Sequence, residues 1–173
     1  MAASNAYTRG HSEFGHIAAG PTDVPWGEAG EEAVQIQIAV QNVELHGAGS
    51  KSAFDVGITR ADLDLVVNGI DGSLTNIHRF LGLATGDITG SLPVSDEVLS
   101  INAENIGEAV REVYSLGAGA LSLVRRIEVP SAKPFNLGPL AQTKTGWMIP
   151  SVTFRCLNPG DDIVMTIRDI SSS

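Results

Sequence analysis

Residues 33–69 read AVQIQIAVQNVELHGAGSKSAFDVGITRADLDLVVNG, and this stretch decides the fold that the sequence predicts. Over 34–41, four β-branched residues alternate with glutamine or alanine. A period of two with apolar side chains on one side indicates a half-buried β-strand. The period slips at Asn42, because the next apolar positions are Val43 and Leu45. A slip of one residue turns buried side chains to solvent, so we expect a β-bulge or bend near 41–42.

The second half of this stretch returns as another strand. Residues 46–52, HGAGSKS, are small and turn-forming. Apolar residues then alternate from Phe54 to Val67, with a second slip near 60–61. The sequence therefore predicts a long, bent antiparallel hairpin with one polar face that becomes acidic towards its end. A hairpin of this length does not bury both faces in a small domain, so its tip is expected to reach beyond the domain.

The chain has 173 residues, 43% hydrophobic and 18% charged, which suits one folded domain with a real core. We expect a turn-rich N-terminal segment over 1–32, with a short strand within 11–20 and an irregular connector over 20–27. Residues 33–173 are expected to form a single β-sandwich or open barrel that includes hairpin 33–69. No stretch has the ~20 apolar residues of a membrane-spanning helix. We therefore expect no membrane insertion.

The predicted fold is mainly β with one or two short helices and roughly seven to nine strands. Residues 74–83 carry apolar residues at helical spacing, with Ser73 as N-cap and Gly82 as a stop signal. A second helix is expected over 103–115, with a strand as the alternative. Later strands are expected at 98–101, at 121–129 up to Pro130, at 147–157 with an interruption at Pro150, and at 163–170 with burial on both sides.

The net charge of −9 is unevenly distributed. No lysine or arginine occurs between Arg9 and Lys51, whereas the same interval holds six acidic residues. Such a segment repels nucleic-acid phosphates instead of binding them. It is either an ordinary solvated acidic surface or an acidic surface that faces DNA without holding it.

We find no motif for catalysis or for a cofactor, and we expect a protein that is not an enzyme. Residues 47–52 lack the glycine that a phosphate-binding loop places directly before its lysine. His11 and His16 have the spacing of a possible metal pair, although surface histidines are commoner. Asp62 and Asp64 share one face of a strand, where surface placement is the expected role. No metal site is therefore predicted.

A few single residues are expected to anchor the core or its surface. The one cysteine, Cys156, alternates with apolar residues and is predicted to be a buried thiol. Trp26 and Trp147 are more often core anchors than interface residues. Arg125 and Arg126 are adjacent on a predicted strand, so they point to opposite faces and do not form a nucleic-acid patch.

The order of these pieces resembles the tail tube (major tail) proteins of long-tailed bacteriophages. The pieces that carry the resemblance are spread over most of the chain. They are Pro21-Thr22-Asp23, the hairpin 33–69, the helix Asn76-Ile77-His78-Arg79-Phe80-Leu81-Gly82, the strand pair Ile127–Lys133 and Trp147–Phe154, and the turn Asn158–Asp162.

The resemblance implies a β-sandwich with a flanking helix, hexameric rings, and stacking of the rings into a tube that conducts DNA during ejection. It places the subunit in the virion tail after assembly in the host cytoplasm, beside terminator, tape measure or sheath proteins. Strands of neighbouring subunits would line the lumen, with Glu44, Asp62 and Asp64 as the lumen-facing candidates. The hairpin loop would contact the next ring, and its candidates are His46, Gly47, Gly49, Ser50, Lys51 and Ser52.

Other classes of protein fit the same sequence pattern. A capsid decoration protein or a tail-end ring protein would use similar elements without forming a tube. A β-sandwich that binds a carbohydrate or another ligand is a further alternative, and an enzyme whose active site lacks a known motif is the last.

Overall fold

The computed structural model describes residues 12–29, 34–46, 53–83, 88–90, 95–119, 123–143, 146–160 and 163–171. Strands dominate and one short α-helix is present, so the prediction of a mainly β fold is confirmed. The elements are β1 (Ser12–Ala18), β2 (Thr22–Ala29), β3 (Val34–His46), β4 (Ala53–Asp71), α1 (Leu74–Phe80), β5 (Ile88–Thr89), β6 (Val98–Leu99), the 3₁₀ helix η1 (Ala103–Asn105), β7 (Arg111–Ala118), β8 (Val124–Leu137), β9 (Ala141–Thr143), β10 (Gly146–Cys156) and β11 (Thr166–Ile170).

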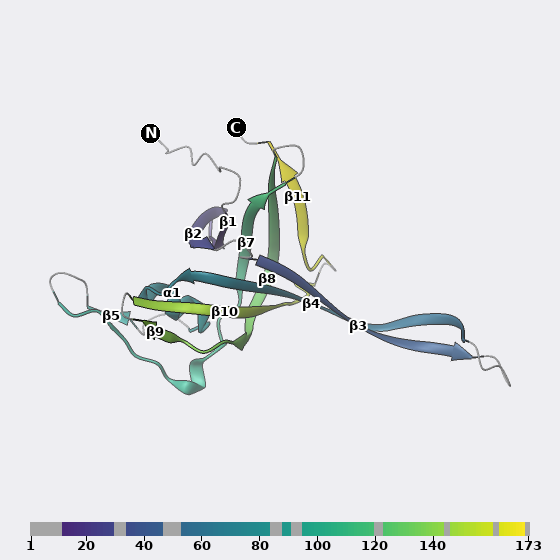
Figure 1. Ribbon diagram of the computed structural model, residues 1–173, viewed down its shortest axis with the longest axis horizontal. Helices are drawn as coiled ribbons and strands as arrows, with labels where there is room; N and C mark the ends of the chain where they lie inside the picture. Colours follow the sequence, from purple (N-terminus) through teal and green to yellow (C-terminus); the bar gives the residue numbers. More distant parts are fainter. Residues whose placement is uncertain are drawn as a thin grey trace.

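Nine of these strands form one antiparallel sheet in the order β2-β1-β7-β8-β10-β4-β3, with β11 added to β8 and β9 added to β10. The long strand β8 turns the sheet, because its first half pairs with β7 and β11 and its second half pairs with β10. In Figure 1, β7, β8 and β11 stand upright whereas β10 and β4 run across the view. The sheet curls until β2 contacts β4. The two strands have no ladder pairing within the described residues, so the barrel is open.

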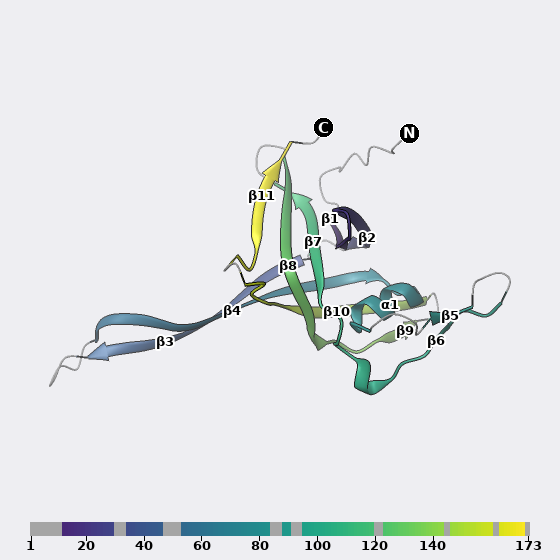
Figure 2. The same ribbon diagram turned by 180° about the vertical axis from the view of Figure 1, so that it is seen from behind.

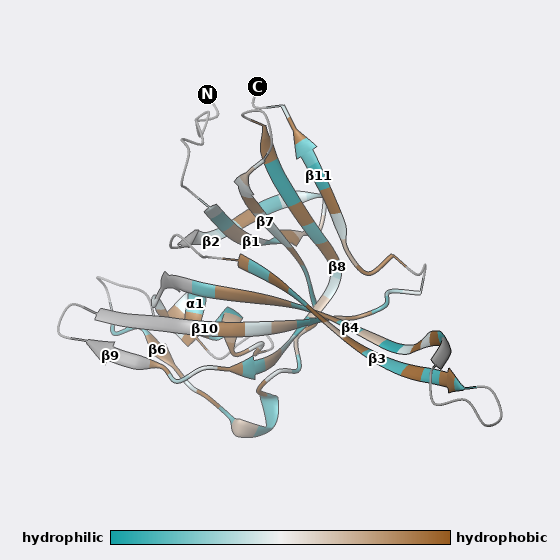
Figure 3. Ribbon diagram, turned by 45° about the vertical axis from the view of Figure 1, so that its right-hand side comes forward, coloured by the Kyte–Doolittle hydropathy of each residue, from teal (hydrophilic) through white to brown (hydrophobic). Residues whose placement is uncertain are grey.

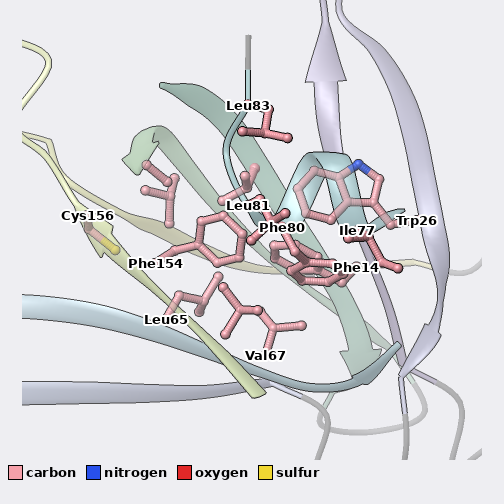
Figure 4. Close-up of a cluster of buried hydrophobic side chains, with 14 residues drawn as sticks. Phe14, Trp26, Leu65, Val67, Ile77, Phe80, Leu81, Leu83, Phe154 and Cys156 are labelled. Atoms are coloured by element: carbon pink, nitrogen blue, oxygen red, sulfur yellow. The ribbon is translucent and has the colours of Figure 1, made fainter. Parts of the chain in front are cut away.

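An aromatic cluster fills the space inside this curl (Figure 4). Phe14 of β1 lies at its centre, with ring centroids 5.1 Å from Trp26 and 5.5 Å from Phe154. Phe80 of α1 covers the other side, 5.0 Å from Trp26. Edge-to-face and tilted contacts of this kind add to the area that the rings bury. Because β1, β2, α1 and β10 each supply one ring, the cluster packs the β2–β1 end of the sheet against β10 and the helix.

The helix α1 forms where the sequence predicts it. The side chain of Ser73 accepts a hydrogen bond from the backbone N–H of Asn76, as expected of an N-cap. The helix ends before Gly82, whose φ of +62° is a conformation that side chains with a Cβ rarely adopt. Ile77 and Phe80 are buried on the face towards the sheet.

The prediction of a second helix over 103–115 is wrong, and the strand alternative holds for its second half. Only the 3₁₀ turn η1 forms, and β7 begins at Arg111. The backbone N–H groups of Gly107 and Ala109 donate to the carbonyls of Leu81 and Gly82 instead of to their own chain segment. These contacts tie the segment to the end of α1 and leave an α-helix without its hydrogen bonds.

The predicted connector over 20–27 is also wrong, because most of it is strand β2. β2 is an edge strand of the sheet among the described strands, and edge strands tolerate proline because no neighbour on the outer side needs its N–H. The turn itself covers only Ala19 to Pro21. The predicted strand within 11–20 is confirmed as β1. Residues 12–29 therefore belong to the same sheet as the later strands.

Two expectations about the later strands fail for local reasons. Strand β8 does not end at Pro130 but continues through Pro134 to Leu137. The pairing of β8 with β7 shifts register next to Pro130, and the pairing of β8 with β10 shifts register next to Pro134. Irregular positions of this kind tolerate proline, because the missing N–H interrupts no regular ladder there. Strand β11 is exposed instead of buried on both sides, and among the described strands it pairs only with β8.

Replacing Phe14 with alanine is expected to lower the free energy of unfolding by about 3–5 kcal/mol, since the ring is fully buried among three others. Phe135→Ala is the matched control, because Phe135 is 62% exposed and its loss is expected to cost less than about 1 kcal/mol. Urea unfolding measures both. Equal losses in the two variants would contradict this description of the core.

Asp23 of β2 accepts two hydrogen bonds from Arg126 of β8, at 2.6 and 2.8 Å, and these hold the pKa of Asp23 below its ordinary 3.8. A lowered folded pKa contributes stability that is present above the unfolded pKa and is lost as the pH falls through the folded pKa. In Asp23→Asn, we expect the acid-dependent fall in melting temperature below about pH 4 to become shallower. Asp55→Asn, on the exposed hairpin, is the control. Identical pH profiles for wild type and Asp23→Asn would contradict the pairing.

Candidate assembly surface

The outer halves of β3 and β4 project from the body as a two-stranded ribbon (Figures 1 and 2). We call residues 38–46 and 53–63 the arm. The predicted bulge is confirmed, because the register shifts between Gln41, which pairs with Arg60, and Asn42, which pairs with Ile58. Thr59 is the extra residue, and its hydroxyl donates to the carbonyl of Gln41 at 3.1 Å. The predicted long hairpin is therefore present and bent at the predicted place.

The apolar stripe of β3 continues past the end of the core. Val34 and Ile36 pack against the core, as the alternation predicts. Ile38 is the next residue on the same side, and it is 65% exposed because none of the described elements covers it. Figure 3 shows hydrophobic positions along both strands of the arm. The large exposed apolar residues of the arm are Ile38, Val40, Val43, Leu45, Val56 and Ile58.

Beyond the bulge, both faces of the arm are apolar. The extra residue lies in β4, so side chains alternate along β3 without interruption. Val43 and Leu45 therefore point to the face opposite Val40. Ile58 pairs with Asn42 and Val56 pairs with Glu44. Val56 and Ile58 therefore lie on the face opposite Val43 and Leu45. A two-stranded ribbon has no layer of its own to cover either face, so each exposes two large side chains that a partner surface can bury.

The arm also has an open edge. β3 is the last strand of the sheet and pairs only with β4 within the described part of the chain. Its outer N–H and C=O groups form a row that another strand can extend. The arm thus combines a free edge with two apolar faces.

Two of the three predicted lumen-facing carboxylates lie together. Asp62 and Asp64 are on one face of β4, and both are paired with arginines. Arg155 of β10 donates to both oxygens of Asp64, and Arg60 Nε lies 2.9 Å from Asp62. The Cζ atom of Arg155 lies 4.1 Å from the ring centroid of Phe135. The arginines compensate the charge of both aspartates, so this face is not an unpaired acidic wall.

Glu44, the third candidate, is not brought to the same place. Asp62 pairs with Ala39 of β3 and shares its face, whereas alternation along β3 puts Glu44 on the opposite face. Its carboxylate lies 3.2 Å from His46 Nε2, on the exposed outer part of the arm. The assignment of these carboxylates to a lumen stays a prediction. Of the predicted inter-ring contacts, His46 is exposed, whereas Gly47, Gly49, Ser50, Lys51 and Ser52 lie outside the described residues.

Sequence reasoning missed the arginine partners of the aspartates. Arg155 meets Asp64 because β10 and β4 are neighbours in the sheet, a pairing between residues far apart in the chain. The one sequence signal for this contact was the alternation of Val152, Phe154 and Cys156, which predicts that Arg155 lies on the opposite, polar face of its strand. The separate faces of Arg125 and Arg126 are confirmed by their different partners, Asp169 for the first and Asp23 and Glu128 for the second.

The other candidate sites are placed as follows. Within the described residues, no group of three histidine, cysteine, aspartate or glutamate side chains could hold a metal ion. His16 accepts a hydrogen bond from the buried Trp26, and His11 lies outside the described part.

Cys156 is buried as predicted, and burial raises the pKa of its thiol to about 11. The side chain of Trp147 is outside the described residues. No described helix has the length and apolar character needed to cross a membrane.

No protein-family model and no curated protein matches the chain. Among solved structures, it is similar to a chain of a structure described as the cryo-EM structure of the anti-feeding prophage (AFP) baseplate, 6-fold symmetrised. That match has a TM-score of 0.42 and 12% sequence identity, and it covers 100% of this chain and 99% of the other. A likeness at this level assigns no function.

The contact between Asp64 and Arg155 is expected to stabilise the base of the arm. In a double-mutant cycle with Asp64→Asn and Arg155→Met, we expect a coupling energy of about 1–3 kcal/mol, because both side chains are mostly shielded from water. The matched cycle with Asp62→Asn and Arg60→Met is expected to give less than about 1 kcal/mol, since Arg60 is exposed. Equal coupling energies, measured by urea unfolding, would contradict this ranking.

Proposed function

We propose that the chain is a structural subunit of a bacteriophage tail tube, and that it acts without enzymatic activity or a cofactor. In this proposal the subunits form hexameric rings, the rings stack, and the resulting lumen conducts DNA during ejection. The observation that carries the proposal is the arm, with its open strand edge and its two apolar faces. A monomer leaves these surfaces in water, whereas an assembly of identical chains covers them.

The geometry of the arm suits contact between identical copies. The arm leaves the body on one side, so it reaches a different surface on the next copy. A contact of this head-to-tail kind generates a ring when the rotation closes. Strand pairing across the open edge of β3 would join the sheets of neighbours into one larger barrel. Burial of the exposed apolar side chains would add about 25 cal/mol for each Å² removed from water.

The charge of the chain suits passage of DNA without binding. The net charge is −9, and like charges keep phosphates from being trapped on the wall of a tube. The exposed carboxylate of Glu44 is a candidate for such a wall, while the arginine pairs of Asp62 and Asp64 reduce their share of the negative potential. The proposed location is the virion tail, with other tail proteins such as a terminator, a tape measure protein or a sheath as partners.

The arm would also serve a ring that does not stack, such as a tail-end ring protein. Electron microscopy of the purified protein in negative stain separates the two roles. Tubes of uniform width support the tail tube subunit, and closed single rings support the ring protein. Monodisperse monomers at high concentration would contradict both.

We expect Ile58→Ser to abolish assembly without unfolding the chain, because Ile58 is 68% exposed on the arm and contributes no buried core. Ile101→Ser is the matched control, since Ile101 is also exposed, at 50%, but lies away from the arm. Sedimentation measures assembly and circular dichroism measures folding. Assembly of Ile58→Ser at the wild-type concentration would argue against the arm as the contact surface.

A further inference from the structure

The described arginines divide into two groups. Arg79 and Arg111 have no carboxylate within ion-pair distance in the described part of the chain, and the neighbouring charge that lowers the pKa of Arg79 is the positive charge of Arg111. All the others make an ion pair with aspartate or glutamate. These paired arginines are Arg60, Arg125, Arg126, Arg155 and Arg168.

Neutral groups contact the two arginines that have no carboxylate partner among the described residues. Arg79 of α1 donates to the amide oxygen of Asn76 at 3.3 Å, and its Cζ lies 5.8 Å from the ring centroid of Trp26. Arg111, the first residue of β7, donates to the carbonyl of Leu83 at 3.2 Å. Its Nε is buried and has no hydrogen-bond partner. Burial lowers the pKa of both arginines, and for Arg79 the nearby positive charge of Arg111 lowers it further.

His16 supplies a third donor, and Trp26 links it to Arg79, because the indole of Trp26 contacts both side chains. The indole Nε1–H of Trp26 donates to His16 Nδ1 at 2.8 Å, so Nδ1 carries no proton. The proton of the neutral ring is therefore on Nε2, which is a donor. Burial, followed by the charges of Arg79 and Arg111, lowers the pKa of His16, which keeps the ring neutral at pH 7. The three side chains come from β1, α1 and β7 and thus have positions fixed by the fold.

These residues form a half-buried group of donors, which we call the cationic cluster: His16, Arg79 and Arg111. Removing positive charge from water is costly unless a negative group compensates it. Two guanidinium groups and an N–H donor are suited to a carboxylate or phosphate, whose oxygens accept several hydrogen bonds at once. The cluster therefore has the composition of an oxyanion site.

We propose that the cationic cluster binds an oxyanion, and that in the assembly this oxyanion is a carboxylate of a second copy of the chain. The second part rests on the proposed function. The source follows from the charge balance, since the chain has 20 acidic residues and 11 lysines and arginines. Within each copy, the remaining described arginines already have acidic partners, so surplus carboxylates are the abundant oxyanion on the surface of a neighbour.

The first arm of the test measures oxyanion binding by the unassembled protein. In a Trp147→Phe background, Trp26 is the remaining tryptophan, and its fluorescence reports on Arg79 beside it. We expect a saturable change with phosphate, relative to chloride at equal ionic strength. Arg79→Gln should weaken the apparent affinity about tenfold, as loss of a charged hydrogen bond does, and Arg79→Lys should restore part of it. Arg168→Gln, which removes an exposed paired arginine, should leave it unchanged.

A fluorescence response that is absent, or that is the same in folded Arg79→Gln as in wild type, would overturn the oxyanion site. The second arm tests its source. If a neighbour's carboxylate fills the cluster, assembled protein should lose the phosphate response, and Arg79→Gln should require about tenfold more protein to assemble. Assembled protein that still binds phosphate, or wild-type assembly of Arg79→Gln, would overturn the second copy as the source. If wild type does not assemble, the proposed function fails, while the phosphate arm still decides the site.

Discussion

A ribbon of two strands cannot bury both of its faces by itself, and this constraint governs the structure. The hairpin of β3 and β4 begins inside the domain, where Val34, Ile36 and Leu65 contact the core. It then continues outwards with no described layer beneath it, and the apolar positions of β3 change face between Val40 and Val43. The bulge at Thr59 leaves apolar side chains on both faces of the outer part. The function that we propose follows from what must cover those faces and the open edge of β3.

The body of the molecule contacts the base of this arm through strand pairing and an ion pair. The curl of the sheet around Phe14, Trp26, Phe80 and Phe154 joins strands from both ends of the chain. β4 is fixed between β3 and β10, and the pair of Asp64 with Arg155 lies where the arm leaves the body. These contacts at the base matter for the proposed assembly, because a preorganised contact loses less conformational entropy when it forms. The cationic cluster beside α1 is a second surface, and no carboxylate of the described residues pairs with its arginines.

Much of the fold can be predicted from local patterns. The alternation in 34–45 predicts the hairpin and the position of its bulge, and Ser73 with Gly82 predicts the helix. The predictions fail where tertiary contacts decide. Segment 103–115 looks helical by spacing, but its backbone N–H groups bond to the end of α1. Pro130 looks like a strand end, but it lies at a register shift. The partner of Asp64 was not predictable, because Arg155 comes 91 residues later in the chain and the register of β10 is set by the whole sheet.

The central claim is that the arm is covered by sister molecules. Amide hydrogen exchange of residues 38–46, compared between assembled and unassembled protein, tests it most directly. Alternate amides of β3 already donate to β4, so the account concerns the amides that point to the outer edge, where the described part of the chain has no partner strand. It predicts that these outward-pointing amides exchange rapidly in the unassembled chain and become strongly protected on assembly. Unchanged rapid exchange along β3 in assembled particles would contradict it.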